Sequence, residues 1–383
     1  MFELKLLKRI DWLTIIIVLA LVGFGLVSIA SIMATPFDGG EQGLSDYLAK
    51  LNWNYVEKQA VNFLVGLAVF LILLVLDYQL YKIIIKYAYI ALIILLLALF
   101  LAERTRGMQG WFMFEAIDRA LQPGELCKIG LIIFLAKVVS DSMNKHGKLK
   151  TFKSVLYTVA ICAVPTALVM LQPDFGTAFV YICIWMFVIF TAKISWGYIA
   201  TIVGMFSIAL PASYLFIMSE EQQFRIKVFL NPELDLQKYG YNVMQSKLAI
   251  GSGELYGKGY FNSGTIAQLG YVPERHTDFI FAGIAEGIGF VGGTILIALY
   301  FILIFRWLYM AVKIKDNFGV CLIMGVMGMT LAHVFENVGM TIGLMPVTGI
   351  PLPFISYGGS NLLTNMIGVG IVQNVWMRRP MKK

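Results

Sequence analysis

The segment GYVPERHTDFIF, residues 270–281, holds the residues best suited to chemistry in this chain. Four polar side chains stand directly before a long apolar run: Glu274, Arg275, His276 and Asp278. The simpler interpretation is that Thr277 or Asp278 caps the helix that this run predicts. A carboxylate at a helix N-terminus is also kept ionised by the helix dipole, as a general base must be at neutral pH. Asp278 is therefore the candidate catalytic base.

Cations that suit a phosphate or a pyrophosphate lie upstream of this segment. Arg225 falls in QQFRIKVFLNP, and Lys258 falls in the glycine-rich stretch GSGELYGKGY. Guanidinium and ammonium groups bind phosphate oxygens through charge-assisted hydrogen bonds. The glycine pattern is not a Walker loop, because no Gly-Lys-Ser/Thr follows it. These residues favour an anionic ligand.

Ionisable residues inside or beside apolar runs are costly, and they often mark functional sites. Glu125 and Lys128, in LQPGELCKIG, are three residues apart, so they share a helix face and can pair. A structural ion pair and a functional one are equal alternatives here. Asp174 follows a proline in LQPDFGTA, which predicts a helix break of the kind that binds charged groups.

A second irregular stretch, GIPLPFISYGGSNLL, covers residues 349–363 at the start of the last apolar run. It combines prolines and glycines with the hydroxyl groups of Ser356, Tyr357 and Ser360. Backbone that is not helical at this depth must line a cavity or be buried in protein.

The elements that must position these residues are membrane helices. Of the 383 residues, 59% are hydrophobic and 14% are charged, and the mean hydropathy is +0.77. A soluble domain is about half apolar and about a quarter charged. The composition thus excludes a soluble enzyme, a disordered chain and a secreted disulfide-rich module. The net charge of +7 is explained by Lys and Arg on cytoplasmic loops, and we expect no nucleic-acid partner.

About ten apolar runs approach the ~20 residues that a membrane-crossing helix needs. These runs are residues 12–34, 58–79, 82–102, 123–141, 155–171, 175–193, 196–216, 277–306, 318–343 and 357–377. They are continuous, which excludes a β-barrel. Residues 166–180 form either a break between two spans or a re-entrant bend. We expect an all-α polytopic membrane protein in which residues 1–383 form one transmembrane helical domain.

The distribution of Lys and Arg predicts the orientation of the chain in the membrane. With ten spans, the basic residues at both termini and in alternate connections fall on one side, which is then cytoplasmic. The opposite face carries the segment 217–276, a loop of about sixty residues between spans seven and eight. We expect short helices in this large extracytoplasmic loop.

These stretches together resemble the SEDS family (shape, elongation, division and sporulation), the RodA/FtsW/SpoVE family of bacterial cell-wall polymerases. The similarity covers nearly the whole chain. It is carried by LQPGELCKIG, LQPDFGTA, FRIKVFLNP, AIGSGELYGKGY, GYVPERHTDFIF and GIPLPFISYGGSNLL, in the order of the family. VPER and the early RIDW resemble the RodA-like elongation branch more than the division branch.

The resemblance implies a peptidoglycan glycosyltransferase of the bacterial cell membrane that polymerises lipid II on the extracytoplasmic face. Asp278 matches the family's essential aspartate and would take the proton of the acceptor hydroxyl in an inverting reaction. The residues implied in substrate binding are Arg225, Lys128, Lys258, Glu125, Asp174, Glu274, His276, Ser356 and Ser360. A divalent cation, Mg²⁺ or Mn²⁺, stays open as a cofactor. The implied partner is a class B penicillin-binding protein, a transpeptidase.

Two positions depart from the family pattern. Gly110 stands where many members have an arginine, so Arg104 or Arg106 would have to supply that contact. Gly287 follows Glu286 where many relatives have a pair of glutamates.

Two other classes of function stay open. A lipid II flippase or transporter would depend on the deeper carboxylates of Glu125, Glu286 and Glu336. A non-catalytic scaffold for the partner enzyme is the third class. An essential acid at the outer surface, beside a large external loop, favours chemistry there over transport through the midplane.

Overall fold

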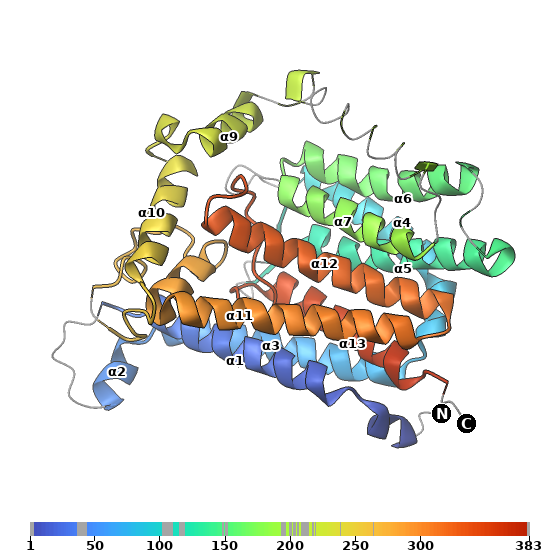
Figure 1. The fold of residues 1–383 in the computed structure, drawn as a ribbon, viewed down its shortest axis with the longest axis horizontal. Coiled ribbons are helices and arrows are strands. Elements are labelled where there is room, and N and C mark those ends of the chain that lie inside the picture. The colour runs from blue at the N-terminus through green and yellow to red at the C-terminus, as the bar shows by residue number, and fades with distance from the viewer. Residues whose placement is uncertain are drawn as a thin grey trace.

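The computed structural model describes most of the chain. The described residues are 4–36, 44–101, 110–114, 119–147, 149, 152–192, 197–198, 201, 204, 207, 214–216, 218, 220–237, 239–262 and 264–380. Within them, long helices lie side by side and form one bundle (Figure 1). The helix η1 and the end of α13 lie at one end of this bundle, and α10 lies at the other (Figure 1).

The elements follow one another along the chain as short and long helices with one small hairpin. The first half has η1 (Leu4–Arg9), α1 (Trp12–Ile32), α2 (Leu44–Lys50), α3 (Trp53–Val75), η2 (Tyr78–Leu80), α4 (Tyr81–Ala98), η3 (Leu99–Leu101), β1 (Phe112–Phe114), β2 (Arg119–Leu121), α5 (Pro123–His146), α6 (Phe152–Leu171) and α7 (Phe175–Thr191). The second half has α9 (Glu220–Leu230), η5 (Pro232–Leu234), α10 (Tyr239–Ser252), α11 (Ile280–Lys313), α12 (Asn317–Thr341) and α13 (Gly359–Met377).

Six described helical stretches are long and apolar enough to cross a membrane. They are Trp12–Ile32, Trp53–Val75, Tyr78–Leu101, Lys153–Leu171, Ile280–Lys313 and Asn317–Thr341. Nine of the predicted runs coincide with a long helix, and the tenth, 196–216, falls largely outside the described residues. The helical membrane architecture is thus confirmed, and the count of ten spans and the large loop stay predictions.

The structure adds one element that the sequence did not predict. β1 and β2 pair in antiparallel register within the otherwise helical fold, with Phe112 opposite Leu121. This pairing satisfies backbone groups of an irregular segment between α4 and α5. Within 166–180 the helix is interrupted, since α6 ends at Leu171 and α7 begins at Phe175, and the choice between two spans and a re-entrant bend stays open.

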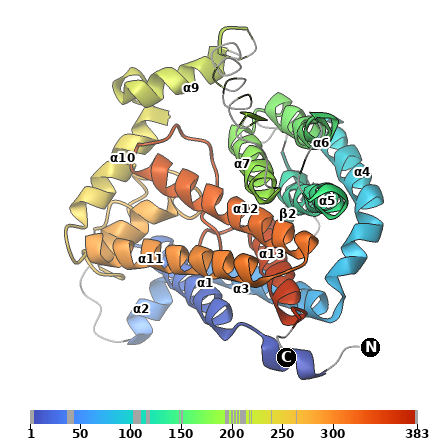
Figure 2. The ribbon, with the colours of Figure 1, turned by 45° about the vertical axis from the view of Figure 1, so that its right-hand side comes forward.

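The helix α12 forms the centre of the bundle. It packs against α5, α7, α11 and α13, as both views show (Figures 1 and 2). In its membrane-spanning window 78% of residues are buried, against 22% for Tyr78–Leu101 at the periphery. Close packing depends on its glycines, because a β-carbon at Gly325 would lie 2.8 Å from Ile132, and one at Gly328 would lie 2.7 Å from Phe187. Polar residues on α12 are therefore enclosed by protein.

Candidate active site

Asp278 lies in the turn that leads into α11 and is half-buried. The N-cap of α11 is Phe279, so the expectation that Thr277 or Asp278 caps this helix was wrong. The backbone oxygen of Asp278 accepts a hydrogen bond from Nδ2 of Asn337 on α12, at 2.8 Å. Its carboxylate lies against the backbone of Gly349, where an added β-carbon would be 3.4 Å from Oδ2. Asp278 is thus held at the meeting point of two loops.

The first loop is a tight turn organised by Glu274. This residue adopts a left-handed conformation with φ +48°, and its backbone oxygen accepts hydrogen bonds from the amides of Thr277 and Phe279. The hydroxyl of Thr277 donates to the Glu274 carboxylate at 3.3 Å. Backbone strain of this kind persists only where the surroundings enforce it, and it often accompanies functional sites. Glu274 therefore shapes the turn that presents Asp278.

The second loop, which joins α12 to α13, is fastened to the first through Ser356. Its hydroxyl donates to the backbone oxygen of Thr277 at 2.7 Å and accepts from the amide of Leu352 at 2.8 Å. The amide of Tyr357 donates to the backbone oxygen of His276 at 2.9 Å. Ser356 and His276, both predicted site residues, therefore connect the two loops around Asp278.

An aromatic cluster covers this connection. The ring of His276 lies 5.1 Å from that of Tyr55 and 5.6 Å from that of Tyr357, measured between ring centroids. Tyr55 belongs to α3 and also meets Tyr357 edge to face, at 5.2 Å. Edge contacts of this type add stability beyond burial alone. The start of α3 is thereby packed against the candidate active site.

Two amide side chains that sequence reasoning missed hold the loops in place. Gln59 of α3 is buried, donates to the backbone oxygen of Ser356 at 3.0 Å and accepts from the amide of Gly358 at 3.1 Å. Nδ2 of Asn337 donates to the backbone oxygen of Ile350 at 2.7 Å as well as to the backbone oxygen of Asp278. The sequence feature that could have identified both residues is an amide side chain inside an otherwise apolar run, because such a group must find hydrogen-bond partners there.

Behind the loops, a chain of buried polar groups runs from α5 to α12. The ammonium of Lys128 lies 2.6 Å from a carboxylate oxygen of Glu125 and 2.7 Å from Nε2 of His333. The other ring nitrogen, Nδ1, lies 3.2 Å from the backbone oxygen of Pro351. Because an ammonium only donates, Nε2 accepts, and we assign the ring proton to Nδ1, which donates to Pro351. This chain therefore supports the second loop from inside the bundle.

Lys128 is fully buried in this arrangement, at 0% exposure, and Glu125 is 1% exposed. The predicted pairing of the two residues is confirmed. A direct contact of either residue with a substrate stays a prediction.

Asp174 caps α7 and belongs to a neighbouring polar group. Its carboxylate accepts from the amide of Thr177 at 3.0 Å and from Nε2 of Gln122 at 3.2 Å. The amide of Gln122 donates to the hydroxyl of Ser360 at 3.0 Å. Gln122 thereby links two predicted site residues, one before α7 and the other at the start of α13.

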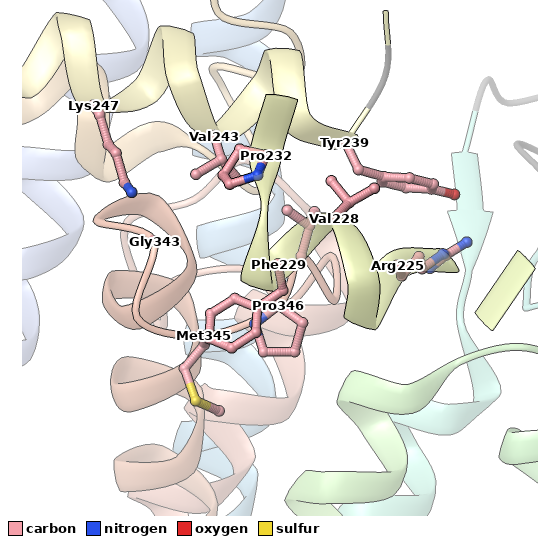
Figure 3. A pocket seen from close by; sticks show the side chains of 11 residues that line it. Arg225, Val228, Phe229, Pro232, Tyr239, Val243, Lys247, Gly343, Met345 and Pro346 are labelled. Carbon is pink, nitrogen blue, oxygen red and sulfur yellow. The ribbon is translucent and has the colours of Figure 1, made fainter. Parts of the chain in front are cut away.

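Arg225 lies apart from this group, on α9. Its guanidinium stacks over the ring of Tyr239, 4.6 Å from the centroid. Both residues line a pocket that also contains Lys247 of α10 and residues 345–347 (Figure 3). Residue 347 is two positions from Gly349, so the pocket adjoins the loop that contacts Asp278. The pocket thus places two cations along the loop that joins α12 to α13.

Lys258 is engaged in an internal ion pair. Its ammonium lies 2.9 Å from Glu286 at the start of α11. The Glu286 carboxylate also accepts hydrogen bonds from the amides of Ile266 and Ala267, at 2.7 and 2.9 Å. This carboxylate anchors the segment between α10 and α11. A contact of Lys258 with a substrate stays a prediction.

The two departures from the family pattern have different outcomes. A β-carbon at Gly287 would lie 2.7 Å from the ring of Tyr260, so a second carboxylate at this position requires that ring to move. Gly110 is buried, whereas Arg104 and Arg106 lie outside the described residues. Among the residues that are described, no group of three or more His, Cys, Asp or Glu side chains is placed to hold a metal ion.

Replacing Gly349 with alanine should impair the site without unfolding the protein. Gly349 has φ +75°, which costs a residue with a side chain about 1–2 kcal/mol, and the new methyl group would touch the Asp278 carboxylate. We expect the activity that depends on Asp278 to fall about tenfold or more, because the strained backbone would shift this loop and small displacements of reacting groups are costly. The control is Gly147→Ala, which has φ +71° at the end of α5 and an open surrounding. Equal activity of the two variants would contradict this prediction.

Replacing Lys258 with methionine separates its structural role from a role in binding. If the ion pair with Glu286 is structural, the melting temperature of Lys258→Met should fall, and the Michaelis constant for the substrate should stay within about twofold of wild type. The expected loss is about 1–3 kcal/mol, the cost of leaving one buried polar group without its partner. A large rise in the Michaelis constant at unchanged melting temperature would instead place Lys258 on the substrate.

The fold and the site together define a helical integral membrane protein whose candidate base is enclosed by two loops at one end of the bundle. The chain belongs to the FtsW/RodA/SpoVE family, since the family model described as cell cycle protein matches residues 11–380.

Named relatives agree with this assignment. The peptidoglycan glycosyltransferase MrdB of Escherichia coli (strain K12) is 37% identical over 327 residues, which cover 85% of this chain and 86% of MrdB. The probable peptidoglycan glycosyltransferase FtsW of Trichlorobacter lovleyi is 31% identical, and the matched region covers 96% of this chain and 93% of that FtsW. Stage V sporulation protein E of Bacillus subtilis is 30% identical, with 95% and 96% covered.

Solved structures share the fold. RodA of Thermus thermophilus superposes with a TM-score of 0.69 at 27% identity, covering 97% of this chain and 98% of RodA. A chain from a peptidoglycan synthase complex that coordinates polymerisation and crosslinking reaches a TM-score of 0.75 at 27% identity, with 96% and 97% covered. The resemblance inferred from the motifs is thus confirmed at the level of family and fold.

Proposed function

We propose that this chain is a peptidoglycan glycosyltransferase that polymerises lipid II, a disaccharide-pentapeptide carried on undecaprenyl pyrophosphate. The relatives MrdB and FtsW are named as a peptidoglycan glycosyltransferase and a probable peptidoglycan glycosyltransferase. The observation that carries the proposal is the position of Asp278, whose carboxylate lies against Gly349 where Ser356 and Asn337 fasten the two loops together. The sequence identity of 37% with MrdB favours the RodA-like elongation branch.

In the proposed reaction, the 4-hydroxyl oxygen of the acceptor sugar attacks the anomeric carbon of the donor. A carbon–oxygen bond forms there, and the bond to the pyrophosphate oxygen breaks and leaves its electron pair on undecaprenyl pyrophosphate. Asp278 takes the hydroxyl proton as general base. Because the donor linkage is α and the product is β-1,4, a single displacement inverts the configuration, so one base is sufficient.

The leaving pyrophosphate needs positive charge near it. Arg225 and Lys247 line one pocket beside the Asp278 loop, and such cations stabilise the charge that develops on the departing group. Lys247, which sequence reasoning missed, joins Arg225 in this role. Lys128 and Lys258 serve internal partners in the described conformation.

A divalent cation, Mg²⁺ or Mn²⁺, is compatible with the described residues if it is held by one carboxylate together with the phosphates of the substrate. Mg²⁺ often uses one or two protein carboxylates together with the phosphates of a substrate, and Asp278 is placed to offer one. When bound, such an ion would neutralise pyrophosphate charge. Restoration of activity by Mg²⁺ or Mn²⁺ after chelation would support a cation bound in this way.

The topology that we propose places both termini in the cytoplasm and the site on the extracytoplasmic face of the bacterial cell membrane. The excess of Lys and Arg near the termini supports this orientation. The partner that we propose is a class B penicillin-binding protein, because a structural relative comes from a complex for polymerisation and crosslinking.

Purified chain incubated with lipid II, with and without the partner, tests the proposal. We expect glycan polymer that forms in the presence of moenomycin. Transfer of lipid II across a vesicle bilayer without polymer would favour the flippase instead. Activity of the partner alone, unchanged by this chain, would favour a scaffold.

A further inference from the structure

The helix η1 contacts α13 at one end of the bundle (Figure 1). A group of cations gathers there. We call Arg9, Arg306, Lys313 and Arg379 the terminal cation cluster. The guanidinium of Arg379 lies 3.6 Å above the ring of Trp376, and that of Arg306 lies 5.9 Å from the same ring. The cluster therefore surrounds one aromatic side chain at the end of α13.

Its second aromatic partner is Tyr309 on α11. The guanidinium of Arg306 lies 5.1 Å from the Tyr309 ring, and the ammonium of Lys313 lies 5.5 Å from it. Arg9 of η1 donates to the backbone oxygens of Met377 and Arg379, at 3.4 and 3.3 Å. Three segments distant in sequence thus contribute to one cluster.

The scaffold beneath the cluster is built from reciprocal hydrogen bonds. The amide of Asp11 donates to Gln373 at 3.0 Å, and Nε2 of Gln373 donates back to the Asp11 oxygen at 3.0 Å. The Asp11 carboxylate accepts from Nε of Arg306, also at 3.0 Å. These bonds join the start of α1 to α11 and α13, and they hold Arg306 in place.

Positive charge exceeds negative charge at this point. The carboxylate of Asp11 pairs with Arg306 and also acts on the charge of Arg379, whereas Arg9 bonds to backbone oxygens and Lys313 lies over the Tyr309 ring. Burial, together with the nearby charges of Arg9 and Arg306, lowers the pKa of Arg379. An anion placed here would relieve this repulsion and gain charge-assisted hydrogen bonds.

The surface beside the cluster is apolar and suits acyl chains. Phe305 is 63% exposed, Tyr309 47% and Val312 75%, and their spacing places them on one face of α11. Phe301 stacks on Phe305 at 6.4 Å between centroids. A soluble anion would have no use for this stripe, whereas a lipid has both a charged head and apolar tails.

We propose that the terminal cation cluster binds the phosphodiester headgroup of an anionic phospholipid, whose acyl chains lie along the exposed stripe of α11. Basic pockets between membrane helices recognise such headgroups, and Trp and Tyr side chains sit at the level of the headgroups. The site lies at the opposite end of the bundle from α10 (Figure 1). It is therefore separate from the site around Asp278 and independent of the proposed reaction.

The test uses the purified full chain in a neutral detergent. Phosphatidylglycerol, cardiolipin or phosphatidylcholine is added, and binding is measured by native mass spectrometry and by the shift in melting temperature. We expect the two anionic lipids to bind and stabilise, and phosphatidylcholine to have little effect. Each of Arg9→Gln, Lys313→Gln and Arg379→Gln should weaken anionic lipid binding about fivefold, as expected for about 1 kcal/mol per charge. Lys313 is exposed, so its replacement leaves the fold intact.

The matched control is Lys153→Gln, which removes the same charge from an exposed position near the start of α6. This variant should bind phosphatidylglycerol as wild type does. An equal loss in Lys153→Gln would show diffuse attraction and overturn the proposal. Competition by glycerol phosphate or inorganic phosphate at the concentration of the lipid would identify a free-anion site and would also overturn it.

Discussion

Asp278→Asn should abolish glycan polymerisation while leaving the protein folded. The substitution keeps the size of the side chain but removes the group that accepts the proton, and general-base catalysis commonly contributes about 10²–10⁴-fold. Since the N-cap of α11 is Phe279, no cap is lost and the melting temperature should stay near that of wild type. The measurement is polymer formation from lipid II by the purified chain with its partner.

Glu233→Gln is the control for this experiment. Glu233 is an exposed carboxylate in η5, so its replacement should leave polymerisation unchanged. Asp278→Glu should retain part of the activity, because the carboxylate is kept but displaced toward Gly349. Full polymerisation by folded Asp278→Asn would exclude Asp278 as the base.

Breaking the buried ion pair of Glu125 and Lys128 should cause the largest loss of stability. Removing one partner of such a pair leaves a buried charge uncompensated and costs about 3–5 kcal/mol. Both Lys128→Met and Glu125→Leu should therefore lower the melting temperature strongly. Replacing both residues should recover much of this loss, since apolar pairs often substitute well for buried ion pairs. Thermal unfolding of the four proteins in detergent measures the coupling.

The double variant also separates two roles of Lys128. A stable and active double variant would mean that the pair is structural, whereas a stable but inactive one would place Lys128 in substrate binding. Lys153→Met, an exposed change on α6, should stay within about 0.5 kcal/mol of wild type. Single variants as stable as this control would contradict the assignment of a buried pair.

Much of the architecture was predictable because apolar length alone specifies a membrane helix. The runs at 12–34 and 318–343 coincide with α1 and α12, each within two residues. The hairpin of β1 and β2 was not predicted, since strands of three residues carry too little periodicity to distinguish them from a loop. The same limit applies to the kink in α11 at Gly289, which interrupts a helix of 34 residues.

For the candidate site, the motifs indicated which loops carry polar residues but not how these loops are connected. Asp278, Ser356 and His276 were singled out, and the structure places them at one meeting point. Gln59 and Asn337 were missed, because their partners are backbone atoms far away in the chain.

The membrane environment, the helical architecture and the family can be read from the amino-acid sequence. These follow from local properties: apolar length, charge and motif order. Which polar groups meet depends on how the helices pack. This packing pairs Lys258 with Glu286, and it joins Lys128 to His333. The physical reason is that a buried charge or amide must find a partner wherever the packed helices offer one, and that partner is determined by the packing of the whole bundle rather than by the neighbouring sequence.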